Sequence, residues 1–254
     1  MTDPQQVGAD LLQEIIHTIK GHELRRPRNT QTVPGPSDLG ATCQRKLGYK
    51  LAGTPKHNQE PSWRPMVGTA VDEWLTTIFG NVTLPDGQPR YLVNQPKLEV
   101  GRINGEPVHG HYDAYDTCTR TVIDWKCLST AGVRRTRSKG ISDTYRTQRH
   151  LYARGLASTG VPVQYVANIV MPKSGDFDEF LIDIEPYDEQ VAVTALTRAE
   201  ATANALNVPG IHPGMLPAVD DYCTFCAWYS PGATDTATAC PGMMAAPKPA
   251  ISLV

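Results

Sequence analysis

Three residues on two neighbouring segments have the types and spacing that metal-dependent cleavage of phosphodiester bonds requires. Asp113 lies in one strand-like segment, and the next segment is built around Asp124, Trp125 and Lys126. Two carboxylates can hold Mg²⁺ or Mn²⁺, which binds a scissile phosphate and lowers the pKa of an attacking water. A lysine beside them would position that water or stabilise the negative charge that develops on the phosphorane.

An antiparallel hairpin would bring the two aspartates together. Asp113 and Asp124 are directly opposed whenever the connecting loop is centred between Cys118 and Thr119, and a two-residue or four-residue loop meets this condition. Directly opposed positions have Cβ atoms about 4.5–5.5 Å apart, so both carboxylates can share one divalent cation. Lys126 follows Asp124 by two residues and therefore projects from the same face of the strand.

Two other interpretations of these residues stay open. The acids and the lysine could be a solvated surface ion pair, which would have no role in catalysis. His109 and His111 share the strand face of Asp113, so a histidine-rich zinc site is a rival, although an exposed stretch of strand is the simpler place for these imidazoles. Two buried acids on an apolar strand, by contrast, would be costly without a cation.

Four cysteines form a second group, with one near the start of the chain and three near its end: Cys43, Cys223, Cys226 and Cys240. Thiolates with this spacing are typical of metal or cluster ligands. They allow a [4Fe-4S] cluster or an all-cysteine zinc site, and spacing alone does not separate the two. Either centre would join Cys43 to the three cysteines near the chain end, and would stabilise the fold by restraining the long stretch of chain between them. Cys118 and Cys127 remain as free thiols.

The composition is that of one globular domain. The chain has 254 residues, of which 40% are hydrophobic and 20% charged, so it can bury a sizeable core. No apolar run is long enough to cross a bilayer, and Asp3, Asp10 and Glu14 stand where a signal peptide would be basic and then apolar. We therefore expect a cytoplasmic protein, in a compartment that keeps thiols reduced.

The net charge of −2 argues against a protein that coats nucleic acid generally, but permits a local basic channel. Basic residues gather in three groups: Arg25, Arg26 and Arg28; Arg45 and Lys46; and Arg134, Arg135, Arg137 and Lys139. The third group follows the acidic strands almost at once. It could be a solvated, flexible loop, but its position favours contacts with phosphates.

The hydrophobic periodicity predicts alternating helices and strands. We expect helices over 9–24, 37–51, 65–79, 143–158 and 187–206, and strands over 91–100, 108–116, 120–128, 163–171 and 179–184, the first three as an antiparallel meander. Cys43 would lie in the middle of the second helix. The third would bury an apolar face made of Val67, Ala70, Val71, Trp74 and Ile78, with Asp72 inside or beside it.

One helix carries further polar side chains near the proposed site. Gln148 and Tyr152 lie four residues apart on one face, where an amide and a phenol could bond a phosphate or position water, although Tyr152 could equally be a core residue. Arg146 and Arg149 add positive charge to this helix. Three tryptophans could stack on unpaired bases, although burial is the commoner outcome: Trp63, Trp125 and Trp228.

Taken together, these motifs resemble the RecB-like branch of the PD-(D/E)XK nucleases, which includes the CRISPR-associated exonucleases and the AddB nuclease domain with its four-cysteine [4Fe-4S] cluster. The resemblance extends from Ser37 to Pro241. The matching elements are Cys43 with Arg45 and Lys46, Gly68–Leu75, Gly110–Ala114, Asp124–Lys126, Gln148 with Tyr152, and Cys223, Cys226 and Cys240 with Pro241.

The resemblance implies an α/β, restriction-endonuclease-like core with a mixed central sheet flanked by helices and termini joined by a metal cluster. It implies an N-terminal helix and linker over 1–36, a nuclease domain over 37–241 and a flexible tail over 242–254. The implied activity is Mg²⁺- or Mn²⁺-dependent exonuclease action on DNA ends or single strands in recombination, repair or phage replication. The implied partners are DNA, a helicase or recombination protein, or further copies of the chain.

Two departures from the family pattern stand out. Asp72 occupies the place of a metal-binding histidine, and its oxygen ligands favour a harder ion. Cys226 and Cys240 are separated by 13 residues, more than the short spacing usual in the family. The alternative to an enzyme is a nucleic-acid-binding accessory protein that kept the fold and cluster but lost turnover. A structural protein held together by a zinc site is a third possibility. Between the two metals, the resemblance favours iron over zinc.

Overall fold

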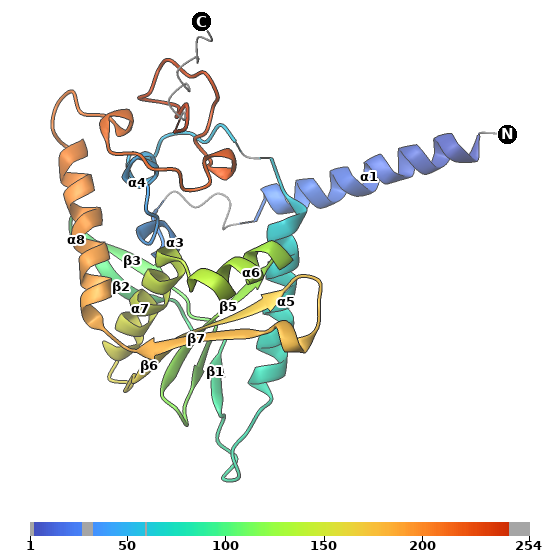
Figure 1. Cartoon of the computed structure of the whole chain (residues 1–254), viewed down its shortest axis with the longest axis vertical. Coiled ribbons are helices and arrows are strands. Elements are labelled where there is room, and N and C mark those ends of the chain that lie inside the picture. Colours follow the sequence, from blue (N-terminus) through green and yellow to red (C-terminus); the bar gives the residue numbers. More distant parts are fainter. Residues whose placement is uncertain (1–2, 27–32, 59, 244–254) are drawn as a thin grey trace, which may run out of the picture.

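The structure, a computed structural model, describes residues 3–26, 33–58 and 60–243 (Figure 1). Arg28, half of the predicted linker and nearly all of the predicted tail lie outside the described residues. The α-helices are α1 (Pro4–Leu24), α3 (Pro36–Leu39), α4 (Gln44–Leu51), α5 (Trp63–Gly80), α6 (Thr130–Lys139), α7 (Asp143–Ala157) and α8 (Glu189–Leu206). The strands are β1 (Tyr91–Val93), β2 (Leu98–Ile103), β3 (Glu106–Gly110), β4 (Ala114–Asp116), β5 (Thr121–Leu128), β6 (Tyr165–Pro172) and β7 (Leu181–Pro186).

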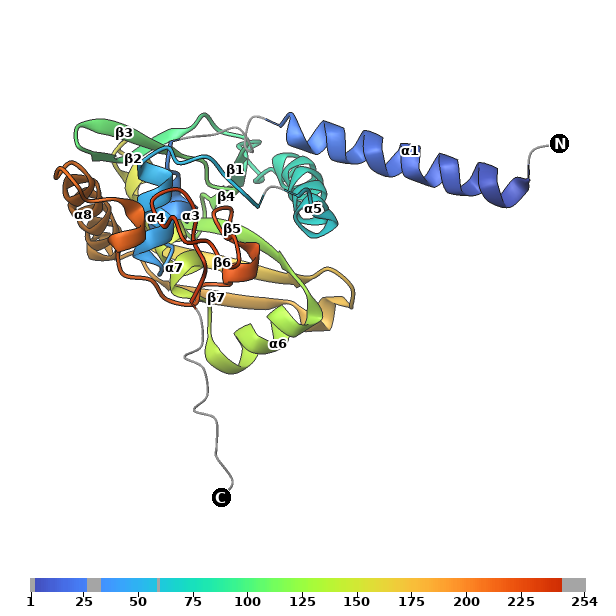
Figure 2. The ribbon, with the colours of Figure 1, turned by 90° about the horizontal axis from the view of Figure 1, so that it is seen from above.

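A five-stranded mixed sheet forms the centre of the molecule, in the order β1-β4-β5-β6-β7. The pair β5 and β6 is parallel, with α6 and α7 in the connection between them, and the other neighbouring pairs are antiparallel. Strands β2 and β3 form a separate hairpin. Helices lie on both sides of the sheet (Figure 2). The predicted α/β class with a mixed sheet flanked by helices is therefore confirmed.

The hairpin of β4 and β5 has the predicted register. Ala114 pairs with Ile123 and Asp116 with Thr121, so the connecting loop has four residues and is centred between Cys118 and Thr119. The carboxylate of Asp116 holds this loop, because it accepts hydrogen bonds from the Cys118 amide at 3.1 Å and the Thr119 hydroxyl at 2.9 Å. Continued by one position toward the open end of the hairpin, this register sets Asp113 opposite Asp124.

The main core lies between the sheet and helices α7 and α8. It joins apolar side chains from β2, β5, β6 and these two helices: Val100, Val122, Leu151, Leu156, Val166 and Leu196. A short second core near the chain end contains Tyr49 stacked on Trp228, whose centroids are 5.8 Å apart, together with Cys240. This second core packs the C-terminal segment against α4. A metal centre that joins the two ends of the nuclease domain would require this proximity.

The meander and the second helix were predicted wrongly in detail. The expected strand over 108–116 is two strands, because β3 ends at Gly110, where a Cβ atom would lie 2.6 Å from Pro36 and 2.8 Å from Tyr152. The expected helix over 37–51 is interrupted, and Arg198 donates to the carbonyls of Leu39 and Ala41 that a continuous helix would have used. Cys43 is consequently the N-cap of α4, where its thiol is not enclosed by helical turns.

Two further predictions about helices need correction. On α5 the expected apolar face is largely solvent-exposed, with Trp74 60% exposed, whereas Leu75 is buried and Phe79 stacks on Trp125. The physical reason is that the main contacts of α5 with the sheet are those with β1 and β5, and these strands cover one part of the helix. The basic segment after β5 is α6 and not a loop, because Ser129 caps it and Val133 anchors it in the core.

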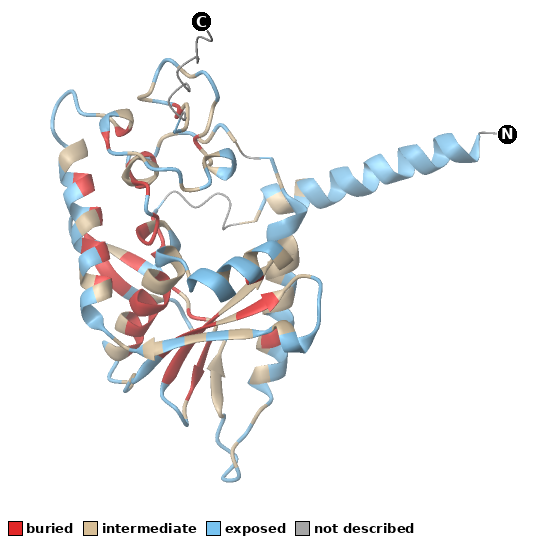
Figure 3. Ribbon diagram, viewed as in Figure 1, coloured by how far each residue is buried: buried red, intermediate tan, exposed pale blue. Residues whose placement is uncertain are grey.

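Helix α1 projects away from the rest of the molecule (Figures 1 and 2). None of its residues is buried, and it is pale blue along most of its length in Figure 3, with tan only at the end nearest the body. Within the described part of the chain, no helix combines the length and apolar character needed to span a membrane.

Candidate active site

The two opposed aspartates lie at the open end of the β4–β5 hairpin. The carboxylate of Asp113 accepts a hydrogen bond from the backbone amide of Trp125 at 2.6 Å, which ties it to β5 beside Asp124. The side chain of Asp124 is only 1% exposed. Burial raises the pKa of Asp113 well above its usual value, and the nearby charge of Asp124 raises it further. The hairpin therefore concentrates negative charge in a poorly solvated place.

Lys126 supplies the positive charge closest to these acids. Its Nζ lies 2.5 Å from Asp124 Oδ2 and 4.8 Å from the centre of the Tyr145 ring on α7. Burial disfavours the charged ammonium, but Asp124 and Asp113 outweigh this effect and raise the pKa of Lys126. The lysine is consequently charged at neutral pH, and the aromatic face of Tyr145 holds it from the other side. Tyr145 was not identified from the sequence, although it precedes Gln148 by one helical turn.

Asp72 approaches the same site from α5. Burial and the charge of Asp124 raise the pKa of this carboxyl, whereas His111 and Lys126 lower it. Its Oδ1 is buried and has no hydrogen-bond partner. His111 is partly buried and stacks on Tyr112, while His109 is exposed. The structure thus brings Asp72, Asp113, Asp124 and Lys126 together from three separate segments, and it places only one of the two histidines close to them.

Asn168 is a member of the site that the sequence did not reveal. It lies opposite Asp124 in the parallel pair of β5 and β6, and its Nδ2 donates to Asp124 Oδ2 at 2.7 Å. It is fully buried. The available signal was a single amide within the otherwise apolar segment Val166–Met171, but its partner became evident only from the strand register.

We expect Asn168→Ala to destabilise the protein by about 1–3 kcal/mol, because Asp124 would lose a buried partner. Cleavage activity should fall as well, since the carboxylate would no longer be oriented. Urea unfolding monitored by circular dichroism measures the first effect. Asn204→Ala, on the exposed side of α8, is the matched control and should lie within about 0.5 kcal/mol of the parent. Equal stability of the two variants would contradict the assigned role of Asn168.

The acids have the chemistry of a site for a hard divalent cation. Three carboxylates face one ammonium, so the site carries excess negative charge in a poorly solvated region, and Asp72 retains a buried oxygen that nothing satisfies. Among the residues that the structure describes, no three acidic, histidine or cysteine side chains are already arranged around one ion position. Lys126, Asn168 and the Trp125 amide engage the carboxylate oxygens instead. Oxygen ligands of this kind suit Mg²⁺ and Mn²⁺.

Gln148 and Tyr152 bond to each other rather than pointing freely into the site. Gln148 Nε2 donates to Tyr152 Oη at 2.7 Å, and both side chains are buried. Tyr152 belongs to the main core, as the alternative interpretation of the sequence allowed. Gln148 lies one helical turn from Tyr145, so it borders the site.

Two arginines of α7, Arg146 and Arg149, are held by acidic side chains of β7. Arg149 is 1% exposed and pairs with Asp183 at 2.7 Å and Glu185 at 2.5 Å, so its guanidinium fastens α7 to β7 and is not available to a phosphate. Arg146 bonds Glu185 through two nitrogens and lowers the pKa of that carboxyl, together with Arg149 and His150, to about 2.

The predicted basic group after β5 is exposed on α6: Arg134, Arg135, Arg137 and Lys139. Arg135 contacts the hydroxyl and ring of Tyr222, which immediately precedes Cys223. Arg137 donates to the Glu179 carbonyl at 3.4 Å. Since α6 follows β5 along the chain, this positive surface begins at Arg134, eight residues after Lys126.

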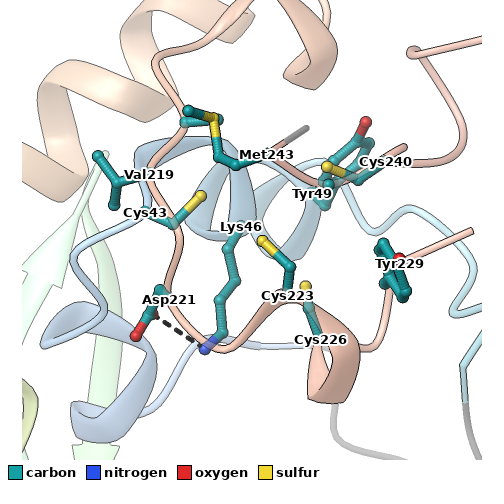
Figure 4. A pocket seen from close by; sticks show the side chains of 12 residues that line it. Cys43, Lys46, Tyr49, Val219, Asp221, Cys223, Cys226, Tyr229, Cys240 and Met243 are labelled. Atoms are coloured by element: carbon teal, nitrogen blue, oxygen red, sulfur yellow. Dashed lines mark hydrogen bonds and ion pairs between the residues drawn. The ribbon is translucent and has the colours of Figure 1, made fainter. Parts of the chain in front are cut away.

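The four predicted cysteines line one pocket, although residues 43 and 240 are far apart in the sequence. Their thiols turn toward a common space in Figure 4. All four are free thiols, and burial raises the pKa of Cys226. Lys46 extends between the cysteines and pairs with Asp221 at 3.3 Å. Soft, closely gathered thiols are the donor set of an iron–sulfur cluster or zinc.

The remaining predicted residues have structural surroundings. Arg45 donates to the Leu216 carbonyl at 3.2 Å, and its Nη1 lies 3.9 Å from Cys240 Sγ, so it belongs to the cysteine pocket. Cys118 is exposed in the hairpin loop and Cys127 lies on β5, away from the pocket as expected. Of the three tryptophans considered for base stacking, Trp228 is buried, Trp125 is partly buried and Trp63 is 66% exposed.

Comparison with known proteins supports the fold. No family model and no curated protein matches the sequence. The crystal structure of SSO0001 is similar with a TM-score of 0.51 and 16% identity, over 86% of this chain and 94% of that chain. An alkaline exonuclease from Laribacter hongkongensis (TM-score 0.46, 16% identity, 69% of this chain and 88% of that chain) is also similar, as is a phage-related exonuclease from Haemophilus somnus (0.41, 14%, 63% and 76%). At such low identity, the likeness to SSO0001 shows a shared fold alone.

Proposed function

We propose that the protein is a metal-dependent deoxyribonuclease that hydrolyses phosphodiester bonds as an exonuclease, at DNA ends or in single strands. The observation that supports this most directly is the convergence of Asp72, Asp113 and Asp124 on Lys126. Three carboxylates with one ammonium form a set that holds a divalent cation and a phosphate together.

Each side chain has a separate task in this proposal. Asp72, Asp113 and Asp124 would hold Mg²⁺ or Mn²⁺, and the bound ion would supply Lewis acidity toward the phosphate and a lower pKa for the attacking water. Lys126 stays protonated beside Asp124, so it can donate to the phosphate oxygen on which charge develops. Tyr145 and Asn168 hold Lys126 and Asp124 in place, and they act through these residues rather than on the substrate.

The exposed cations of α6 give the substrate backbone a place to bind. They start close to Lys126 and lie on a protein whose overall charge is slightly negative. A local basic surface of this kind attracts phosphates without binding nucleic acid over the whole molecule. Its contribution should be electrostatic, and hence weakened by salt.

We further propose a structural [4Fe-4S] cluster in the cysteine pocket. The four thiols line one pocket and are soft donors of the kind that iron and zinc both take. Zinc would draw its thiolates to about 2.3 Å from one centre. The resemblance of the sequence to cluster-containing nucleases favours iron over zinc, and either centre would fasten α4 to the chain end.

Digestion of end-labelled DNA tests the proposed function. The purified protein should shorten single- or double-stranded oligonucleotides from an end when Mg²⁺ or Mn²⁺ is present, and EDTA should stop the reaction. Lys126→Ala should lose cleavage and retain DNA binding. A parent protein that binds DNA but is inert with both metals would support the accessory-protein alternative and contradict the enzyme.

A further inference from the structure

Helix α1 presents an apolar stripe that nothing in the described part of the chain covers. The stripe is made of Val7, Leu11, Leu12, Ile15, Ile16 and Ile19, whose exposed fractions range from 38% to 59%. On a helical wheel these side chains occupy one half of the circumference, whereas Asp10, Gln13, Glu14 and His17 occupy the other. We refer to the six apolar residues as the α1 stripe.

A helix with this composition requires a partner. It has 21 residues and includes Gly8 and Gly21, each of which weakens a helix by about 1 kcal/mol relative to alanine. Most helical stability in proteins comes from packing of the apolar face, and α1 packs nothing. Two ion pairs join the end of this segment to the body: Lys20 on α1 with Glu60 at 3.2 Å, and Arg26, just beyond α1, with Glu73 at 3.4 Å.

The charges along α1 are complementary to those of a second copy in the opposite direction. The first half of the segment carries Asp3, Asp10 and Glu14 and no basic residue. The second half carries Lys20 and, just beyond α1, Arg25 and Arg26 against the single acid Glu23. Arg26 already pairs with Glu23 and Glu73, and the pair of Lys20 with Glu60 is exposed, so Lys20 and Arg25 are the charges left for a partner. Antiparallel alignment places the acidic half of each helix beside the basic half of the other and opposes the two helix dipoles, whereas parallel alignment sets like charges together.

The shape of the molecule supports the same orientation. Because α1 projects outward, its length is accessible to another helix (Figures 1 and 2). In an antiparallel pair the two protein bodies lie at opposite ends of a helical rod about 30 Å long. A parallel pair would instead force both bodies to the same end.

A lipid surface is a poorer match for the stripe. Helices that lie on membranes are rich in lysine and arginine on their polar face and usually carry aromatic residues at the boundary. Between Pro4 and Leu24, α1 has no aromatic residue apart from histidine, and its first half is acidic. The leucine and isoleucine side chains instead suit helix-to-helix packing.

From these observations we propose that α1 is a dimerisation element, and that two copies of the chain associate through antiparallel packing of their α1 stripes. The proposal concerns a surface away from the candidate active site. It therefore holds or fails independently of the nuclease proposal.

Sedimentation velocity of the full chain, over about 1–100 μM, tests the proposal. We expect a concentration-dependent dimer. Ile15→Glu, at the centre of the stripe, should weaken association by at least about tenfold, whereas Gln13→Glu adds the same charge on the polar face and should leave the dimer in place. A parent protein that is monomeric throughout, or a dimer that Ile15→Glu does not weaken, would overturn the proposal.

Photo-crosslinking determines the orientation. A benzoylphenylalanine residue in place of Val7 should crosslink to the second half of α1 in the other copy, as mass spectrometry of the digested product would show. A crosslink between two first halves would refute the antiparallel arrangement. Flotation of the parent protein with anionic phospholipid vesicles tests the competing partner. If the protein binds the vesicles as a monomer through the α1 stripe, the partner of the stripe is a lipid surface and the dimer proposal is wrong.

Discussion

Asp113→Asn is expected to abolish DNA cleavage and, at the same time, to raise the melting temperature of the metal-free protein. The substitution removes one of three crowded negative charges, while the remaining amide oxygen can still accept the hydrogen bond from Trp125. Each kcal/mol of relieved repulsion should raise the melting temperature by about 2–4 °C for a domain of this size. Cleavage should fall by about 10³-fold, since losing roughly 4 kcal/mol of transition-state stabilisation corresponds to that factor.

The pH dependence of this effect has a definite sign. The folded-state pKa values of Asp72 and Asp113 are raised, so protonation of these acids favours the folded state. Their contribution to stability is fully present below the unfolded pKa of about 3.9 and is lost as the pH rises through the folded values. We therefore expect Mn²⁺ or Mg²⁺ to raise the melting temperature more at pH 8 than at pH 5, where protons compete for the oxygens.

Scanning calorimetry with and without Mn²⁺ measures both effects. Asp116→Asn is the matched control, because it makes the same chemical change three residues later on the same arm of the hairpin, at a carboxylate that accepts hydrogen bonds from the loop. This control should lose some stability but keep the full response to Mn²⁺. A parent protein that Mn²⁺ does not stabilise, or an Asp113→Asn variant that responds to Mn²⁺ like the parent, would contradict a cation site at these acids.

Cys223→Ser is expected to remove the proposed cluster and to loosen the C-terminal segment. The parent protein, purified without oxygen, should be brown and absorb broadly near 400 nm, roughly where thiolate-to-iron charge transfer falls. The variant should be colourless and less stable, because the centre would join α4 to a segment about 180 residues later and its binding energy adds to folding. Metal analysis and ultraviolet-visible spectra provide the direct measurement.

Cys118→Ser separates a general effect of losing a thiol from an effect on the pocket. Cys118 is exposed in the β4–β5 loop, and its replacement should change neither colour nor stability. A colourless parent protein with one zinc ion would favour the all-cysteine zinc site. A parent that contains neither iron nor zinc and is as stable as Cys223→Ser would contradict any structural metal centre.

Some parts of the site could be predicted from the sequence because their spacing is local. The opposition of Asp113 and Asp124 followed from a loop centred between residues 118 and 119; the structure has this loop centre, and its register, continued by one position beyond Ala114 and Ile123, opposes the two aspartates. A hairpin has few degrees of freedom, so a two-residue periodicity and one loop centre determine which side chains face each other. The gathering of the four cysteines was likewise predictable, since one shared pocket satisfies the ligand chemistry that their spacing indicated.

Other parts depended on packing between segments that are far apart in the chain. Asn168 meets Asp124 because β6 pairs with β5 in one register, and Tyr145 meets Lys126 because of how α7 crosses β5. Arg149 looked like a cation available to DNA, but Asp183 and Glu185 on β7 bury it. Helical periodicity identified α5 but not its buried face, because that face is chosen by the strands it contacts.

The sequence by itself determined which side chains are candidates for chemistry, through the types of its acids, lysine and cysteines and the short spacings between them. The tertiary structure alone decided which of these groups are charged neighbours, which are buried partners and which remain exposed. The physical reason is that side-chain type and local spacing are set by a short stretch of covalent chain. Burial, pKa and ion pairing depend instead on atoms that folding brings together from distant segments.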